Sequence, residues 1–168
     1  LTNVVVSGNN ASIQGGGVML VGGATDGSFS TFADNTAATN TGGFLLSSGT
    51  ATIDNSIFAD NSGTPNDILG SITSNGYNIL EDYSGFTAAG TDITGSYNVS
   101  AQQIDATTGH AYHALSAGDA AVDAGNGSAP ATDILGTSRD ANADIGAFEL
   151  LTNSLATAVD DSVTVSGS

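Results

Sequence analysis

The segment Phe32-Ala33-Asp34-Asn35 recurs as Phe58-Ala59-Asp60-Asn61, and the two copies begin 26 residues apart. Val6 and Asn9 occupy the first and last of these positions one period earlier. A second pair of segments keeps the same separation: Gly16-Gly17-Val18-Met19-Leu20 and Gly42-Gly43-Phe44-Leu45-Leu46. Several residue types at one fixed offset indicate an internal repeat. A repeat decides the fold, because each unit buries its apolar face against its neighbours.

Each repeat contains short apolar stretches interrupted by Gly and Asn, with no helical spacing of apolar residues between them. Coils of short strands, stacked at about 4.8 Å, satisfy this pattern. We therefore expect an all-β fold, a parallel β-helix (solenoid), which is right-handed because parallel crossovers have that hand.

Stacked coils place equivalent residues above one another. Three amides would then form a ladder at a bend, bonding to each other and to turn carbonyls: Asn9, Asn35 and Asn61. Three apolar side chains would stack inside the coils in the same way: Val6, Phe32 and Phe58.

The composition supports the all-β prediction. Of the 168 residues, 17 are acidic and one, Arg139, is basic, which gives a net charge of −16. Only Glu81 and Glu149 among the acidic residues are Glu, and there is no lysine or cysteine. Asp favours turns, whereas a solvated helix needs Glu, Lys, Gln and Arg. The charge repels phosphate and anionic lipid, so we expect no nucleic-acid partner, and the absence of a long apolar run predicts no membrane insertion.

The second half of the chain carries four further signatures, which lie at residues 75–80, 114–125, 132–140 and 144–149. Together they resemble the C-terminal portion of bacterial choice-of-anchor β-helix proteins, over about residues 55 to 149. The two repeated segments resemble the repeats of polymorphic outer-membrane-type surface β-helices. The resemblance implies a pectin lyase-like β-helix at a bacterial cell surface or in the extracellular space.

Three regions follow from this reading. Residues 1–82 would form β-helix coils with the 26-residue repeat, and residues 83–150 the last coil and a C-terminal cap. Residues 116–149 are expected to fold over the last coil, because an open end exposes unpaired backbone groups that template aggregation. Residues 151–168 would be a linker or the first strand of a following immunoglobulin-like or cadherin-like module, since residues 156–165 partly alternate apolar and polar side chains.

Arg139 is predicted to be a structural clamp inside the cap, because a bidentate guanidinium suits a position between carboxylates. Its candidate partners are Asp123, Asp133 and Asp144.

Two segments were considered as metal sites. Asp140, Asn142 and Asp144 carry oxygen ligands at alternate positions, as the start of a Ca²⁺ loop does, so Ca²⁺ is the cofactor this loop would hold. The alternative is an Asp/Asn-rich turn. His110 and His113 lie three residues apart, which on a strand places them on opposite faces, so we expect no shared metal there.

The expected function is a non-catalytic structural or adhesive extracellular module. Its partners would be a second copy, bound through the C-terminal strand to build a fibre, or surface glycans. A polysaccharide lyase or hydrolase is the alternative. Lyases need cations that this chain lacks, and Asp34 and Asp60, one coil apart, would be too close for inverting hydrolysis. The threonines do not recur in a T-x-T array, which disfavours ice binding.

Overall fold

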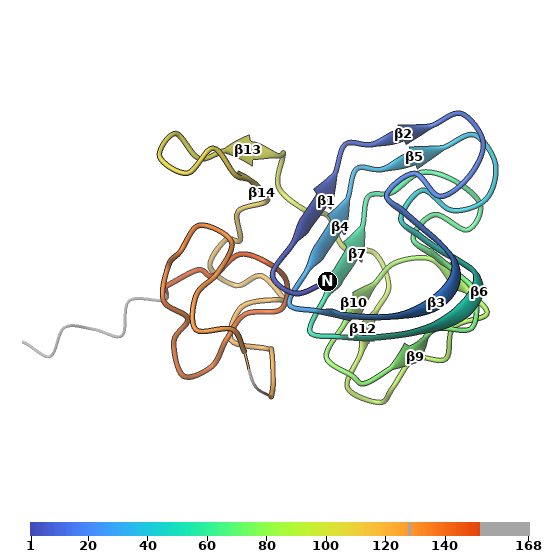
Figure 1. Ribbon diagram of the computed structural model, residues 1–168. Coiled ribbons are helices and arrows are strands. Elements are labelled where there is room, and N and C mark those ends of the chain that lie inside the picture. Colours follow the sequence, from blue (N-terminus) through green and yellow to red (C-terminus); the bar gives the residue numbers. More distant parts are fainter. Residues whose placement is uncertain (128, 152–168) are drawn as a thin grey trace, which may run out of the picture.

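The computed structural model describes residues 1–127 and 129–151 (Figure 1). The strand expected at residues 156–165 lies outside the described residues, as does all of the expected linker except Leu151. Every regular element in the described part of the chain is a β-strand. The strands pair in parallel, apart from an antiparallel pair formed by β13 (Gln103–Ile104) and β14 (Ala111–Tyr112). The all-β prediction is confirmed.

The first sheet contains five short strands that come from successive repeats. Their order is β1 (Val5–Ser7), β4 (Thr31–Ala33), β7 (Ile57–Ala59), β10 (Ile79–Leu80) and β12 (Ile93–Thr94). The register aligns Val6 with Phe32 and Phe32 with Phe58, so neighbouring strands keep the 26-residue period of the sequence. Figure 1 shows β1, β4 and β7 side by side.

Two further sheets repeat this arrangement. In the second sheet the order is β3 (Val18–Ser28), β6 (Phe44–Asp54), β8 (Ile68–Leu69) and β11 (Tyr83–Ser84), and β9 (Thr73–Ser74) also pairs with β6. A third, small sheet joins β2 (Asn10–Ala11) to β5 (Thr36–Ala37). The chain therefore visits three sheets in turn and returns to the first one 26 residues later.

The inner core lies between the first and second sheets. Phe32 stacks on Phe58 with ring centroids 4.5 Å apart and planes 4° apart, and Phe44 meets Phe32 edge-on at 6.1 Å. All three rings are buried, while Val6, in the first repeat, is partly buried against the same cluster. Full burial of one such ring contributes about 1.5–3 kcal/mol.

The three asparagines lie in a ladder beside this core. The Nδ2 group of Asn9 donates to Oδ1 of Asn35 at 2.9 Å, and Nδ2 of Asn35 donates to Oδ1 of Asn61 at 3.0 Å. Each acceptor also takes the backbone N–H of the residue before it in the ladder, at 3.1 and 3.0 Å. The last amide, of Asn61, donates to the carboxylate of Asp67 at 2.7 Å.

A second polar ladder, which the sequence analysis did not identify, follows the bend before the first sheet. The backbone N–H of Ser30 donates to Ser56 Oγ at 3.2 Å, that of Ser56 to Asn78 Oδ1 at 3.1 Å, and that of Asn78 to Asp92 Oδ1 at 2.9 Å; the members are Ser30, Ser56, Asn78 and Asp92. Both ladders thus end on an aspartate, which accepts hydrogen bonds and needs no donor in return.

A residue in the left-handed region precedes each ladder position. In the asparagine ladder these residues are Gly8, Asp34 and Asp60, with φ of 68°, 56° and 55°. In the second ladder they are Asn3, Phe29, Asn55 and Tyr77, with φ from 45° to 58°. Gly, Asn and Asp adopt this conformation most readily. The Asp-Asn pair of each repeat is therefore a sharp bend followed by the side chain that satisfies it.

The outer face of the first sheet is apolar and is covered by the C-terminal part of the chain. Ile57 and Ala59 point away from the inner core and pack in a second buried cluster with Ile79, Ala121 and Ile145. We call residues 116–127 and 129–150 the brace. In Figure 1 the brace, in orange and red, lies beside β1, β4 and β7.

The expected cap over the last coil is corrected by these contacts. The backbone N–H of Gly146 donates to the Asn55 carbonyl at 2.9 Å, and that of Ala147 donates to Thr31 Oγ1 at 3.1 Å. The segment thus lies along the side of the repeats. The physical reason is area: an exposed apolar sheet face costs more free energy than a short polar edge that water can solvate.

Substitution of Asn35 tests the asparagine ladder, with Asn9 as the matched control. Asn35 is fully buried, so Asn35→Ala orphans the Asn9 and Asn61 groups that it contacts and should lower the free energy of unfolding by about 3 kcal/mol. Asn9 is exposed, and Asn9→Ala should cost less than about 1 kcal/mol. Urea denaturation of both variants measures the difference. Equal losses would contradict the ladder.

Candidate functional site

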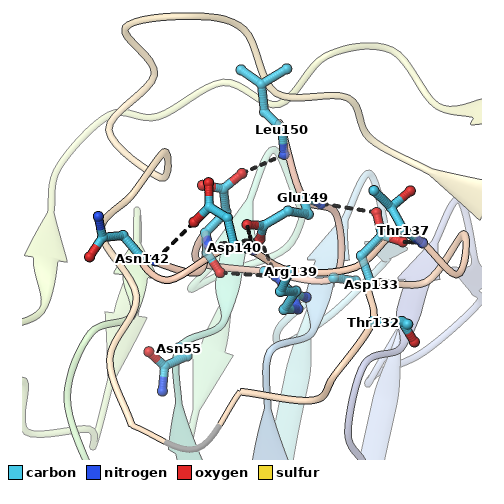
Figure 2. A network of polar contacts seen from close by, with 12 residues as sticks. Asn55, Thr132, Asp133, Thr137, Arg139, Asp140, Asn142, Glu149 and Leu150 are labelled. Atoms are coloured by element: carbon cyan, nitrogen blue, oxygen red, sulfur yellow. Dashed lines mark hydrogen bonds and ion pairs between the residues drawn. The ribbon is translucent and has the colours of Figure 1, made fainter. Parts of the chain in front are cut away.

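The strongest concentration of charged groups is a buried network in the brace (Figure 2). It joins Arg139 to three carboxylates that are each at most 2% exposed: Asp133, Asp144 and Glu149. The surrounding chain forms turns instead of regular strands, so most of its backbone groups have no sheet partner. Buried backbone N–H groups must be satisfied, and side-chain carboxylates do this here.

Arg139 is the centre of the network. Its Nη1 atom forms an ion pair with Glu149 Oε2 at 2.9 Å, and Nη2 donates to the Gly146 carbonyl at 2.8 Å. Nη2 also contacts Asn3 Oδ1 at 3.3 Å, which links the brace to the first repeat. The guanidinium carbon lies 5.0 Å from the centroid of the Phe29 ring, within cation–π range.

The predicted carboxylate partners of Arg139 need a correction. Its ion pair is with Glu149; Asp123 and Asp133 make no ion pair with it, and Asp144 contributes only its backbone carbonyl, at 3.3 Å. The reason is that backbone N–H groups occupy the aspartate oxygens. Glu149 is one of two glutamates in the chain and closes the Gly-Ala-Phe-Glu signature, a signal that could have identified it.

The three buried carboxylates hold the turns of the brace. Asp133 accepts from Thr137 N at 2.8 Å and Glu149 N at 3.1 Å. Asp144 bridges two distant strands of chain, accepting from Asp123 N at 2.7 Å and Leu150 N at 2.6 Å. Glu149 also accepts from the backbone N–H groups of two other brace residues: Asp140 at 3.1 Å and Asp144 at 3.0 Å. These contacts cross-link the irregular segment.

Two buried aspartates have raised pKa values. Burial raises the pKa of Asp144 from 3.8 to about 6, although its two backbone hydrogen bonds oppose the change, and the charge of Glu149 raises it further. Burial also raises the pKa of Asp67, at the end of the asparagine ladder, to about 6, against the hydrogen bonds from Asn61 and from Asp82 N. Both positions combine a structural role with the cost of a buried charge.

The residues of the predicted calcium loop do not converge on one point. Asp140 Oδ1 accepts from the backbone N–H of Asn142 at 2.8 Å, while both oxygens of Asp144 turn inward to backbone groups. No group of three or more His, Cys, Asp or Glu residues suited to a metal ion occurs within residues 1–127 and 129–151. The Ca²⁺ site stays a prediction, and these hydrogen bonds favour the alternative of an Asp/Asn-rich turn.

The two histidines have separate partners. His110 is exposed, and its Nδ1 contacts the Ile134 carbonyl at 2.8 Å. His113 is buried between Ser7 Oγ, 2.8 Å from Nε2, and the Ser100 carbonyl, 2.7 Å from Nδ1. A neutral His113 that donates through Nδ1 and accepts from Ser7 satisfies both contacts. It ties the segment before the brace to the first repeat.

The surface also carries a polar hollow of about 340 Å³ near the second ladder. Its lining includes Asp54, Asn75 and Tyr77. The two carboxylates considered for hydrolysis lie elsewhere: Asp34 is an exposed bend residue, and Asp60 accepts from Val99 N at 2.7 Å. The structure therefore gives these two acids bend positions.

Loss of the buried ion pair should destabilise the protein strongly. Arg139→Met leaves Glu149 charged and buried, so we expect the free energy of unfolding to fall by about 3–5 kcal/mol. Arg139→Lys keeps the charge but loses the forked geometry, and its loss should be smaller. Chemical denaturation measures both values. A loss below about 1 kcal/mol in Arg139→Met would show that the pair does not hold the brace.

Stability should rise as the pH falls from 7 to 5. Asp67 and Asp144 have raised pKa values, so the folded protein binds more protons than the unfolded chain, and their stabilising contribution is lost as the pH rises through about 6. Each group should account for about 1 kcal/mol over this window. Asp67→Asn should remove its share, whereas the exposed control Asp34→Asn should keep it. Melting curves at both pH values give the comparison, and equal slopes in the two variants would contradict it.

Comparison with known proteins adds no named relative to these contacts. No family model, no curated protein and no solved structure matches this chain. No helix within the described residues is long and apolar enough to cross a membrane. A function must therefore be argued from the repeat and from the contacts described above.

Proposed function

We propose that this chain is a non-catalytic structural or adhesive module of an extracellular bacterial surface protein. The observation that carries the proposal is the use of its charged groups: the one arginine and the three carboxylates around it are buried and bonded to one another or to backbone. Groups held in this way stabilise the chain and are not accessible to a substrate.

The proposed architecture is a right-handed parallel β-helix with a lateral brace. Its support is the return of the chain to each sheet after 26 residues, with parallel pairing between successive passes. The hand follows from the general rule for parallel crossovers. Such a rod is a spacer of fixed length, which suits a stalk or fibre.

Self-association is part of this proposal. β1, β2 and β3 each lie at the edge of their sheet, so the first repeat offers unpaired backbone groups. Three apolar side chains of this repeat are exposed: Ile13, Met19 and Val21. Edge strands of this kind pair readily with an added strand. The alternating segment at residues 156–165 of a neighbouring copy is the strand we propose for the contact.

Glycan contact is the second candidate, and it includes the lyase or hydrolase alternative. The polar hollow beside Tyr77 favours it, because an aromatic ring with amide and carboxylate groups is a common lining of sugar sites. Absence of unsaturated or hydrolysed products across a panel of uronic-acid glycans would exclude the enzyme. A glycan array would test binding alone.

The fibre proposal predicts filaments or oligomers of the full chain in electron microscopy and analytical ultracentrifugation. Deletion of residues 155–168 and the edge variant Val21→Lys should each give monomers. Ser96→Lys, which adds the same charge at an exposed position after β12, should assemble normally. Assembly that survives the deletion would contradict the strand contact, and a monomeric full chain would overturn self-association altogether.

A further inference from the structure

The chain contains two Asn-Gly pairs, Asn75-Gly76 and Asn126-Gly127. In such a pair the backbone nitrogen of glycine can attack the side-chain amide carbon of asparagine, because no Cβ obstructs the approach. The new N–C bond closes a succinimide ring, and the side-chain nitrogen leaves as ammonia. Water then opens the ring to aspartate or isoaspartate. No oxidant or enzyme takes part.

Asn126-Gly127 has the geometry that this attack requires. Both residues are exposed. The Gly127 nitrogen lies 2.8 Å from Asn126 Oδ1, so the nucleophile is already beside the amide group that it must attack. A Cβ placed on Gly127 would meet no atom within 4 Å, which shows open space around the reacting nitrogen.

Asn75-Gly76 is held away from the same reaction. The Gly76 nitrogen donates to Ser74 Oγ at 2.9 Å, and the Gly76 carbonyl accepts from Asn55 N at 3.2 Å. Gly76 is buried, and a Cβ placed on it would collide with Thr91. The backbone rotation that brings nitrogen to the side chain would break these contacts, so the second ladder protects this pair.

We propose that Asn126 is a site of spontaneous modification through a succinimide, and that the modification loosens the brace. The Asn126 N–H donates to Asn55 Oδ1 at 2.7 Å, and the Gly125 N–H donates to the Ala143 carbonyl at 2.9 Å. These bonds fasten this turn of the brace to a bend of the repeats and to the buried network.

The product adds negative charge at a crowded position. Asn126 lines the hollow that contains Asp54 and also a second hollow of about 210 Å³ that contains Asp140. A carboxylate at residue 126 faces both acids in a chain of net charge −16, and isoaspartate also lengthens the backbone by one methylene. Repulsion and the altered chain path then oppose the bond to Asn55.

Peptide mapping by mass spectrometry tests the site after incubation of the folded protein in mildly alkaline buffer. Most of Asn126 should convert with loss of ammonia and gain of water, while Asn75 in the same sample stays intact. In denaturant both pairs should convert at similar rates, which makes the difference a property of the fold. Equal conversion in the folded protein, or an intact Asn126, would overturn the proposal.

Hydrogen exchange tests the consequence separately. Asn126→Asp should speed exchange at the backbone amides of Gly125 and residue 126 and leave that of Asn35 unchanged. Asn98→Asp, the matched control, adds the same charge at an exposed position and should leave all three amides unchanged. Unchanged exchange in Asn126→Asp would show that modification does not loosen the brace.

Discussion

The structure depends on the supply of hydrogen-bond acceptors at the bends of the repeat. Each sharp bend turns backbone N–H groups toward the interior, where water cannot reach them, and a side chain from the next repeat accepts them. Because the acceptor belongs to the next repeat, every bend is satisfied only when the repeats stack in register. The two ladders therefore fix the register that also stacks Phe32 on Phe58. A slip of one residue would break both at once.

The same constraint explains why aspartate dominates the composition. A ladder of amides needs an acceptor at its end, and Asp67 and Asp92 provide one without requiring a donor. Short carboxylates also satisfy the turns of the brace, where Asp133 and Asp144 each accept from backbone groups that no sheet can pair. Burial of these charges raises the pKa of Asp67 and Asp144, and Arg139 offsets part of the cost in the brace.

The repeat could be predicted from the sequence because identical positions meet in space. Phe-Ala-Asp-Asn shows its meaning directly: the apolar residue stacks, the aspartate bends and the asparagine joins the ladder. The brace could not be predicted in this way. Its partners, such as Arg139 with Glu149 and Gly146 with Asn55, are single tertiary contacts without a period. The outward position of Ile57 reveals why the segment covers a flank instead of an end, but only once the inner face is known.

Proton–proton contacts measured by nuclear magnetic resonance test the stacked register most directly. The account predicts contacts between Phe32 and both Val6 and Phe58, and between the side-chain amides of Asn35 and Asn61, each pair being 26 residues apart. Contacts displaced by one residue, or contacts between Phe32 and residues near it in the chain alone, would contradict the register on which the ladders and the brace depend.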